Sequence, residues 1–342
     1  MKSGDRLHTM ISRRETLERL GRAALVLGGA AAVGRAAWDR GGLEVHRSGL
    51  EPQTRDYRPR ARRRDAMTAV DLAIAQAGRL GAASPLGTEP AGLTRAAVEA
   101  LGGMARFISR GDVVTIKPNI GWDRTPLHAA NTNPHVVAEL VRLVLDAGAK
   151  RVTVTDASCN EPNRCFQRSG IWKAAYDAGA DVVIPAEHRF RSLRMGGEVL
   201  DEWPIYRPLI DADKVINVPV AKHHNLARYT GAMKNWYGLL GGRRNRLHQN
   251  IDVSIADLAT FMQPTLTVID ATRVLLRNGP QGGNIADAKD LHTVIASVDQ
   301  VAADAYACQL IGVKREDLAY LKMGQDRGLG TMLWENLARR EV

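Results

Sequence analysis

The part of the sequence richest in chemically active side chains lies between residues 217 and 238. Two lysines, two adjacent histidines and several asparagines fall within this short stretch. Lys234 stands among apolar neighbours, so its ammonium group must face a polar cleft or an acidic partner, because burying an unpaired charge is costly. A lysine in an apolar setting has a lowered pKa and can act as a base or a Schiff-base nucleophile. Lys234 and Lys222 are therefore the leading catalytic candidates.

Further polar residues follow the ends of several predicted strands. In open α/β sheets, ligands bind in the crevice outside the carboxyl ends of the strands, so we expect these residues to line one cleft. The helix predicted to begin at Pro134 would add free N–H groups and the positive end of its dipole. The catalytic candidates are Lys234, Lys222, His223 and Asp270. The ligand-binding candidates are Lys117, Asn119, Thr132, Asn133, Asp156, Asn217, Asn235, Gly279 and Asp299.

The chemistry of these candidates points to a small anionic ligand. The lysines supply positive charge, while the aspartates and His223 could orient them, act as acid or base groups, or hold a metal. The alternative is that these residues are only strand-end caps and salt bridges. Candidate metal ligands are His223, His248, Asp156 and Asp270, yet no H-x-x-x-H or H-E-x-x-H spacing occurs. His223 and His224 would point to opposite faces of a strand, so at most one could reach a shared site.

The rest of the chain supplies elements that would position these residues. Short apolar strands alternate with helices, which predicts an open, largely parallel, Rossmann-like α/β sheet with helices on both faces. The predicted strands are 113–117, 151–156, 181–184, 214–218, 266–270 and 293–297. The predicted helices are 66–80, 93–101, 134–146, 170–178, 226–240, 253–262 and 300–311. We expect Asp304 to be buried on the last helix, and Arg243, Arg244 and Arg246 to form a solvated loop.

Several segments together resemble the family known as domain of unknown function 362. They include Ile116-Lys117-Pro118-Asn119, Thr132-Asn133-Pro134, Asn217-Val218-Pro219 and Thr230-Gly231-Ala232-Met233-Lys234-Asn235, with Asn278-Gly279-Pro280 after Asp270. These segments occur in family order over about residues 110–313. The resemblance implies the same α/β architecture but no established chemistry. Many members carry a ferredoxin-like segment with four cysteines, which this sequence lacks, so no iron–sulfur role is carried over and the cofactor stays open.

The three cysteines of the chain form no Cys-x-x-Cys pair. Cys159 and Cys165 are close enough in sequence for a local disulfide if the loop between them turns back. Cys308 lies in an apolar helical run and is expected in the core. Three thiols cannot ligate an iron–sulfur cluster in the usual way, with four.

Most of the positive charge of the protein lies near its N-terminus. The 342 residues carry a net charge of +10, and residues 1–64, with 15 basic and 7 acidic side chains, contribute +8 of it. The remaining chain is nearly neutral, which argues against nucleic-acid binding by the folded body. No stretch of about 18 apolar residues occurs, so a polytopic membrane protein is excluded.

Residues 1–37 have the organisation of an export signal. A basic segment with the pair Arg13-Arg14 precedes a Gly- and Ala-rich apolar run at 23–34, which resembles a twin-arginine signal. Thr16 and Glu18 depart from that pattern, where Phe and Lys are usual, and an amphipathic helix is the alternative. The prediction is export to the periplasm by the twin-arginine machinery, with membrane anchoring if the signal is not cleaved.

The predicted organisation is a signal or anchor at 1–37, an Arg- and Pro-containing linker at 38–64 near the membrane surface, and one α/β domain at 65–342. Two functions fit this organisation. The first is an exported enzyme that acts on a small anionic substrate. The second is a non-catalytic protein that binds a ligand or a metal for an exported partner. Nucleic-acid binding through the arginines of residues 55–64 is a third and less favoured possibility.

Overall fold

The computed structural model describes residues 51–59, 70–78 and 89–342. The predicted signal at 1–37 and most of the predicted linker at 38–64 lie outside these residues. A small part of the linker is described and forms strand β1 (Arg55–Asp56), which pairs in parallel with β11 (Met262–Gln263). Within the described residues, no helix is long and apolar enough to cross a membrane.

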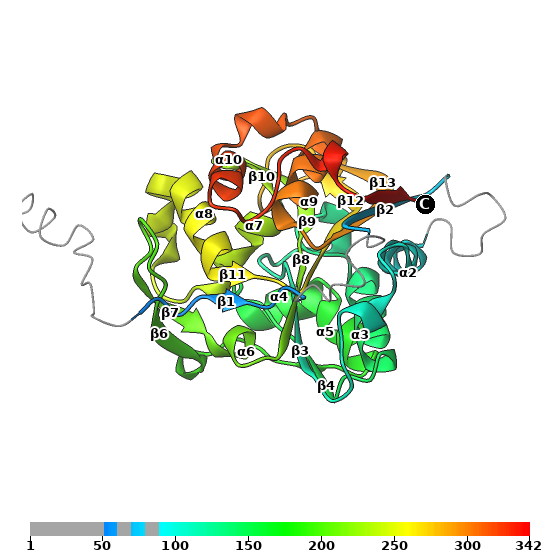
Figure 1. The fold of residues 1–342 in the computed structure, drawn as a ribbon, viewed down its shortest axis with the longest axis horizontal. Helices are drawn as coiled ribbons and strands as arrows, with labels where there is room; N and C mark the ends of the chain where they lie inside the picture. The colour runs from blue at the N-terminus through cyan, green and yellow to red at the C-terminus, as the bar shows by residue number, and fades with distance from the viewer. Residues whose placement is uncertain (1–50, 60–69, 79–88) are drawn as a thin grey trace, which may run out of the picture. The chain divides into compact units, whose positions relative to one another are not determined.

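One large, mostly parallel sheet forms the centre of the described residues (Figure 1). Its main path runs through β14 (Arg339–Glu341), β2 (Leu72–Gln76), β13 (Ala288–Ser297), β12 (Leu266–Leu275), β8 (Lys214–Val218), β3 (Val113–Pro118), β4 (Arg151–Val154) and β5 (Asp181–Val182). Strands β12, β8, β3, β4 and β5 are parallel to one another, and β13 is antiparallel to β12. β9 (Val220–His224) pairs in parallel with the second half of β12, and β10 (Arg228–Thr230) pairs antiparallel with β9.

Helices cover both faces of this sheet, as the sequence predicts. One core layer holds the apolar faces of α2 (Pro90–Ala100), α3 (Pro134–Asp146), α4 (Pro162–Arg168) and α5 (Ile171–Asp177). The other holds those of α6 (Arg207–Ile210), α7 (Ala232–Asn235), α8 (Ile251–Phe261), α9 (Gln300–Ala307) and α10 (Ala319–Asp326). Figure 1 shows α2, α3 and α5 on one side of the sheet and α8 and α10 on the other. A separate hairpin pairs β6 (Phe190–Arg194) with β7 (Glu202–Tyr206).

Helix α3 shows how closely local sequence signals set the elements near the site. The Asn133 side chain accepts a hydrogen bond of 2.9 Å from the His135 amide and caps the helix, and Pro134 occupies its first turn. The helix ends before Gly148, whose φ of +96° is the left-handed conformation that favours glycine. The predicted bounds, 134–146, are confirmed.

Two predicted helices are wrong. Residues 72–76 form strand β2, because this apolar segment is buried on both faces: Leu72 and Ile74 enter one core layer, and Ala73 and Ala75 the other. A short apolar run of this kind cannot be told from a helix by its periodicity. The predicted helix 226–240 is instead strand β10, the short helix α7 and a 3₁₀ turn at Trp236–Leu239.

The parallel direction of β3, β4, β8 and β12 brings their carboxyl ends to one edge of the sheet. β9 continues beyond the carboxyl end of β8 alongside the second half of β12, β10 returns antiparallel to β9, and α7 follows β10. The residues that follow these strands therefore lie in the same region, as expected for an open α/β sheet.

Candidate functional site

Three buried lysines meet at the carboxyl edge of the sheet. Lys117 lies on β3, Lys222 on β9 and Lys234 on α7, so three separate elements supply them. Their exposed fractions are 0%, 1% and 6%. Lysine is almost never this deeply buried without a partner, so the surroundings of each ammonium group show what the site is built to do.

Lys117 is the lysine with an acidic partner. Its Nζ lies 2.7 Å from Oδ1 of Asp156, and it donates a 3.2 Å hydrogen bond to the carbonyl of Pro118. The other carboxylate oxygen of Asp156 accepts a 2.8 Å bond from the Ile120 amide. Burial lowers the pKa of Lys117, and the charge of Asp156 opposes this shift. This pair joins β3 to the end of β4.

Lys222 is held by neutral acceptors rather than by a carboxylate. Its Nζ donates to the carbonyl of Ala130 at 2.5 Å and to Oδ1 of Asn119 at 3.2 Å, and lies 5.9 Å from the centre of the Trp122 ring. Burial lowers the pKa of Lys222 to about 7, and the positive charge of Lys234 acts in the same direction. This ammonium therefore titrates near neutral pH.

Lys234 has neither a hydrogen-bond nor an ion-pair partner among the described residues. Its Nζ lies 3.9 Å from the centre of the Tyr237 ring, a cation–π contact. Burial lowers the pKa of Lys234 to about 8, and the neighbouring charge of Arg244 also lowers it. Of the two surroundings expected from the sequence, a polar cleft or an acidic partner, the acidic partner is not found among the described residues, and no described protein group accepts a hydrogen bond from the Lys234 ammonium.

A chain of three asparagine amides holds the lysines in place. Asn119 donates to Oδ1 of Asn235 at 3.1 Å, and Asn235 donates to Oδ1 of Asn217 at 2.8 Å and to the carbonyl of Lys117 at 3.3 Å. Asn217 donates in turn to the carbonyl of Ala232 at 2.9 Å. The network joins β3, β8 and α7, so the three predicted asparagines position the cluster.

The N-terminus of α7 is held by Asp304 of α9. Its two carboxylate oxygens accept bonds of 2.5 Å from the Ala232 amide and 2.9 Å from the Met233 amide. Asp304 is buried as predicted, and burial raises its pKa to about 7. A Cβ atom on Gly231 would overlap this carboxylate, so a glycine is required there. Asp304 thus fixes the short helix that carries Lys234.

Arg244 corrects the prediction of a solvated loop. Its guanidinium is partly buried and donates to the carbonyls of Ala157, Ser158 and Tyr237 at 2.7, 2.5 and 3.1 Å, and lies 3.4 Å from Sγ of Cys159. It adds a fourth positive charge to the lysine cluster. Nothing in the spacing distinguishes Arg244 from its neighbours Arg243 and Arg246, which are exposed as predicted.

The cysteines do not form the disulfide considered from the sequence. Cys159, Cys165 and Cys308 are all free, with Cys165 buried on α4 and Cys308 buried after α9. Cys159 is exposed, in the loop that follows β4, and its amide donates a 2.9 Å bond to the carbonyl of Gly121. The position of Cys159 beside the basic cluster has no signal in the sequence except its place after a strand.

Hydrogen bonds made by Asp270 and Thr132 connect the carboxyl edge of the sheet to the start of α3. Asp270 accepts bonds of 2.7 Å from the Asn133 amide, and of 2.9 and 2.6 Å from the amide and hydroxyl of Thr272. Thr132 donates to the carbonyl of Val218 at 2.7 Å and accepts from the Asn119 amide. Burial raises the pKa of Asp270. These contacts occupy Asp270, so we assign it a positioning role rather than the predicted catalytic one.

His223 and Gly279 lie together at the end of β9. The Gly279 amide donates to Nδ1 of His223 at 3.2 Å, and a Cβ on Gly279 would overlap the His223 carbonyl, so the close approach requires glycine. His224 points to the other face, as predicted, and stacks on His248 with ring centres 6.0 Å apart. Burial lowers the pKa of His224 to about 2.

The four candidate metal ligands do not come together. His223 contacts the Gly279 loop, His248 packs against His224 and Tyr237, Asp156 pairs with Lys117, and Asp270 binds the start of α3. Within the described parts of the chain, no group of three or more His, Cys, Asp or Glu side chains could hold a metal ion. The described residues therefore do not assemble these four candidates into a metal site.

Asp299 lies at the other edge of the sheet. Strand β13 is antiparallel to β12, with Ser297 opposite Thr267 near the start of β12, so the end of β13 points away from the lysines. Asp299 caps α9 through a 2.8 Å bond from the Ala302 amide and accepts another from the Thr331 amide. The expectation that all strand ends meet failed here because the sequence does not reveal the direction of this strand.

The fold and the cluster define an α/β protein with a basic, amide-lined site at the carboxyl ends of its parallel strands. Residues 114–309, more than half of the chain, match the family described as domain of unknown function DUF362, and the protein belongs to this family. The match contains the three lysines, the three asparagines, Asp304 and Arg244.

The thylakoid-associated protein sll1697 of Synechocystis sp. (strain ATCC 27184 / PCC 6803 / Kazusa) is 26% identical to this chain over 218 residues. The match covers 61% of this chain and 66% of that protein, slightly under two thirds of its length. Among solved structures, a protein from Thermotoga maritima has a TM-score of 0.39 and 13% identity, covering 65% of this chain and 59% of that one. The lactate racemase apoprotein from Thermoanaerobacterium thermosaccharolyticum has a TM-score of 0.39 and 12% identity, covering 69% and 56%. We transfer no property of these two structures to this chain.

Proposed function

We propose that the protein is an enzyme that acts on a small anionic substrate at the lysine cluster. The observation that carries this proposal is Lys234, which is buried without an anionic partner. An unpaired buried ammonium is costly, and proteins retain such groups mainly where a ligand or a reaction uses them. A carboxylate or phosphate group on the substrate would supply the missing acceptors.

The free donors of the cluster support binding of one anionic group. The Lys234 ammonium donates to no described protein group, and Lys222 keeps one donor after its bonds to Ala130 and Asn119. Asp156 is engaged by Lys117 and by the Ile120 amide, so it does not neutralise the other two lysines directly. An oxyanion between Lys222 and Lys234 would gain charge-assisted hydrogen bonds in a poorly solvated setting.

The titration behaviour of the lysines suits acid and base chemistry. The pKa of Lys222 is lowered to about 7 and that of Lys234 to about 8, so both forms of each are available near neutral pH. A catalytic group works best when its pKa is near the operating pH. We assign Lys234 the role of acid or base, because it alone is free of other bonds, and Lys222 the role of binding the anion.

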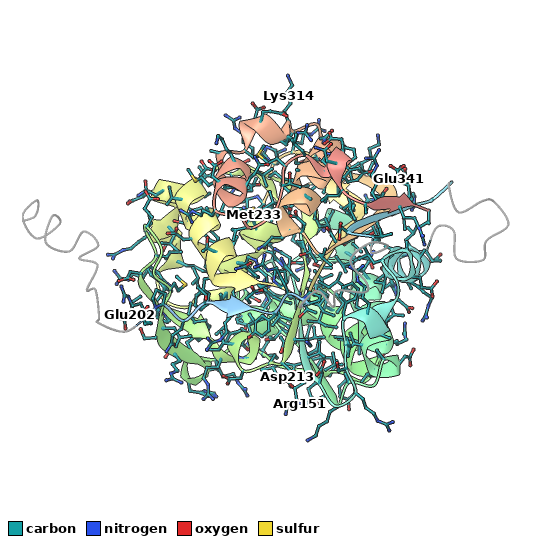
Figure 2. The ribbon with its side chains drawn as sticks, in the orientation of Figure 1. Arg151, Glu202, Asp213, Met233, Lys314 and Glu341 are labelled. Atoms are coloured by element: carbon teal, nitrogen blue, oxygen red, sulfur yellow. The ribbon has the colours of Figure 1, made fainter. Side chains whose placement is uncertain are left out.

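The test uses Lys234→Met with Lys314→Met as its matched control. Lys314 is exposed and lies at the periphery in Figure 2, whereas Met233, next to Lys234, lies in the interior. Wild type and control should show a saturable rise in melting temperature with inorganic phosphate or malonate. They should also convert at least one compound in a mixture of anionic metabolites followed by mass spectrometry. Lys234→Met should do neither, while its free energy of unfolding rises by about 1–3 kcal/mol because an unpaired buried polar group is gone.

The outcomes separate the two functions considered from the sequence. Binding of phosphate or malonate by the wild type without conversion of any metabolite would favour a non-catalytic binding or accessory protein. Absence of both effects would sink the proposal. A loss of stability in Lys234→Met would instead show that Lys234 has a structural role.

We also propose that the protein is exported through the twin-arginine pathway. The support is the Arg13-Arg14 pair before the apolar run at 23–34. The name of the Synechocystis relative associates that protein with a membrane, which is consistent with a membrane-proximal location here. Replacing both arginines by lysine should move the protein from the periplasmic to the cytoplasmic fraction of cells. An undiminished periplasmic fraction would refute this route.

A further inference from the structure

One chemically reactive group beside the lysine cluster has no part in the proposed binding step. Cys159 is exposed in the loop after β4, and its Sγ lies 3.4 Å from Nη2 of Arg244. The same guanidinium donates a hydrogen bond to the carbonyl of Tyr237. Nζ of Lys234 lies 3.9 Å from the centre of the Tyr237 ring. Cys159 and Lys234 are thus linked through Arg244 and Tyr237.

Two of the lysines lie within electrostatic range of Cys159. The negative form of Cys159 is the largest charge effect that raises the pKa of both Lys222 and Lys234, against the lowering by burial. The thiolate, not the thiol, is the nucleophilic form of cysteine, and reactive cysteines lie in electropositive, accessible settings such as this one.

The other two cysteines lack this setting. Cys165 is buried on α4, and burial raises its pKa to about 11. Cys308 is buried after α9, and burial raises its pKa to about 12. The structure describes all three cysteines, and of these only Cys159 is both exposed and close to positively charged side chains.

The geometry points to Cys159 as the nucleophile of the site, attacking an electrophilic carbon of a substrate whose anionic group is bound by Lys222 and Lys234. This inference rests on the proposed function and adds a reacting residue to it. Lys234 supports this inference, because it is 6% exposed, has no hydrogen-bond or ion-pair partner among the described residues, and contacts Tyr237, whose carbonyl binds the same guanidinium as Cys159.

The step is balanced for a substrate with a carbonyl carbon near its anionic group. Sγ of Cys159 forms a bond to the carbonyl carbon, and the π electron pair of the carbonyl moves to its oxygen. The Lys234 ammonium gives a proton to that oxygen and becomes a neutral amine, which its lowered pKa of about 8 permits. The product is a hemithioacetal or hemithioketal, and no oxidant or reductant is needed.

The experiment compares a negatively charged and a neutral alkylating reagent on the full chain. Iodoacetate and iodoacetamide both react by displacement: Sγ forms a bond to the methylene carbon, and iodide leaves with the electron pair. Peptide mass spectrometry assigns the rate at each cysteine. The ratio of the iodoacetate rate to the iodoacetamide rate at Cys159 should exceed the ratio for free glutathione by about tenfold, as a nearby positive charge stabilises the anionic reagent. Cys165 and Cys308 should react far more slowly.

Two variants show whether the lysines are the cause. Lys234→Met should lower the ratio at Cys159 toward that of glutathione, and Lys314→Met should leave it unchanged. Inorganic phosphate should protect Cys159 of the wild type from iodoacetate more than from iodoacetamide. A ratio at Cys159 equal to that of glutathione, or a high ratio that persists in Lys234→Met, would overturn the inference.

Cys159→Ser separates this inference from the proposed function. Because Cys159 is exposed, the variant should melt at the wild-type temperature and still bind phosphate. It should lose conversion of the substrate found in the metabolite mixture by at least about 100-fold. If Cys159→Ser still converts the substrate, the role of Cys159 is wrong and the lysine site is unaffected. If the wild type itself does not bind phosphate, the proposed function is wrong.

Discussion

Basic side chains are buried at the carboxyl end of the parallel strands and exposed at the amino end. At the carboxyl end, Lys222 and Lys234 are buried without a carboxylate in contact. Near the amino end of β3, β4 and β5, a pocket of about 340 Å³ is lined by arginines that include Arg151 and Arg207. Arg207 is exposed and forms an ion pair with Asp211 at 3.0 Å. Arg151 is also exposed, and its label lies at the bottom of Figure 2.

This difference shows that a hollow in the surface and a cluster of buried charges need not coincide. The pocket near the amino end has a volume of about 340 Å³, yet its charged side chains are exposed to water, where an ion pair contributes little to stability. At the carboxyl end, burial of the ammonium groups away from water lowers the stability of the fold. Pairs of variants at the two ends of the strands can measure the difference between buried and exposed charges.

The largest contrast is expected between Asp156→Asn and Asp211→Asn. Asp156 neutralises Lys117 in the interior, so its replacement leaves a buried charge uncompensated and should cost about 3–5 kcal/mol. Asp211 pairs with Arg207 at the surface, and its replacement should cost less than about 1 kcal/mol. Urea denaturation of both variants measures the two free energies of unfolding.

If Asp156→Asn and Asp211→Asn lower the free energy of unfolding equally, the proposed difference between the two ends is wrong. Lys117→Met in the Asp156→Asn background provides the control. Removing the lysine as well should recover part of the lost stability, because the uncompensated ammonium is then gone.

The fold was largely predictable because its strands and helices carry strong local signals. Strand β8 and helix α3 have the predicted bounds, since each is a short apolar run or a capped amphipathic helix. Strand β2 was not predictable, since the same apolar run fits a buried strand and a helix. The direction of β13 was not predictable either, because it depends on pairing with β12 and not on local sequence.

The candidate site was predictable in its members but not in their roles. Lys117, Lys222 and Lys234 were found because they interrupt apolar segments or follow strands. Asp270 and Thr132 carry the same signal, yet they fasten α3. The roles depend on distances between residues about 100 positions apart in the chain, such as Asn119 and Asn235, which spacing in the sequence cannot supply.

A smaller contrast is expected between Gly238→Ala and Gly283→Ala. A Cβ on Gly238 would overlap the carboxylate of Asp156 and lie 2.8 Å from Nζ of Lys117, so the buried pair would have to shift. We expect a loss of about 1–3 kcal/mol, typical of overpacking. Gly283 has open space around its Cβ position, and its replacement should change stability by less than about 0.5 kcal/mol. Thermal or urea unfolding of both variants measures this, and a harmless Gly238→Ala would show that the pair is loosely held.

The last effect expected is a change in the dependence of stability on pH. Because the pKa of Lys222 is about 7 in the folded protein and near 10.5 when unfolded, only the unfolded chain holds this proton between those values. Stability should therefore rise with pH through this window, by at most about 1.4 kcal/mol per pH unit from one lysine. Below pH 7 the penalty for burying the charge is fully present.

Lys222→Met and Lys150→Met test this slope at the two ends of the sheet. Lys150 is exposed before β4, so its replacement should leave the slope of stability against pH between 7.5 and 9.5 as in the wild type. Lys222→Met should reduce the slope, whatever it does to stability at a single pH, because the titrating group is removed. The remaining slope in this variant belongs to Lys234 and Lys117, whose pKa values are lowered by the same burial. If both variants keep the wild-type slope, Lys222 is not desolvated in solution, and the contrast between the two ends of the strands then rests on Lys234 and on the buried pair of Lys117 and Asp156.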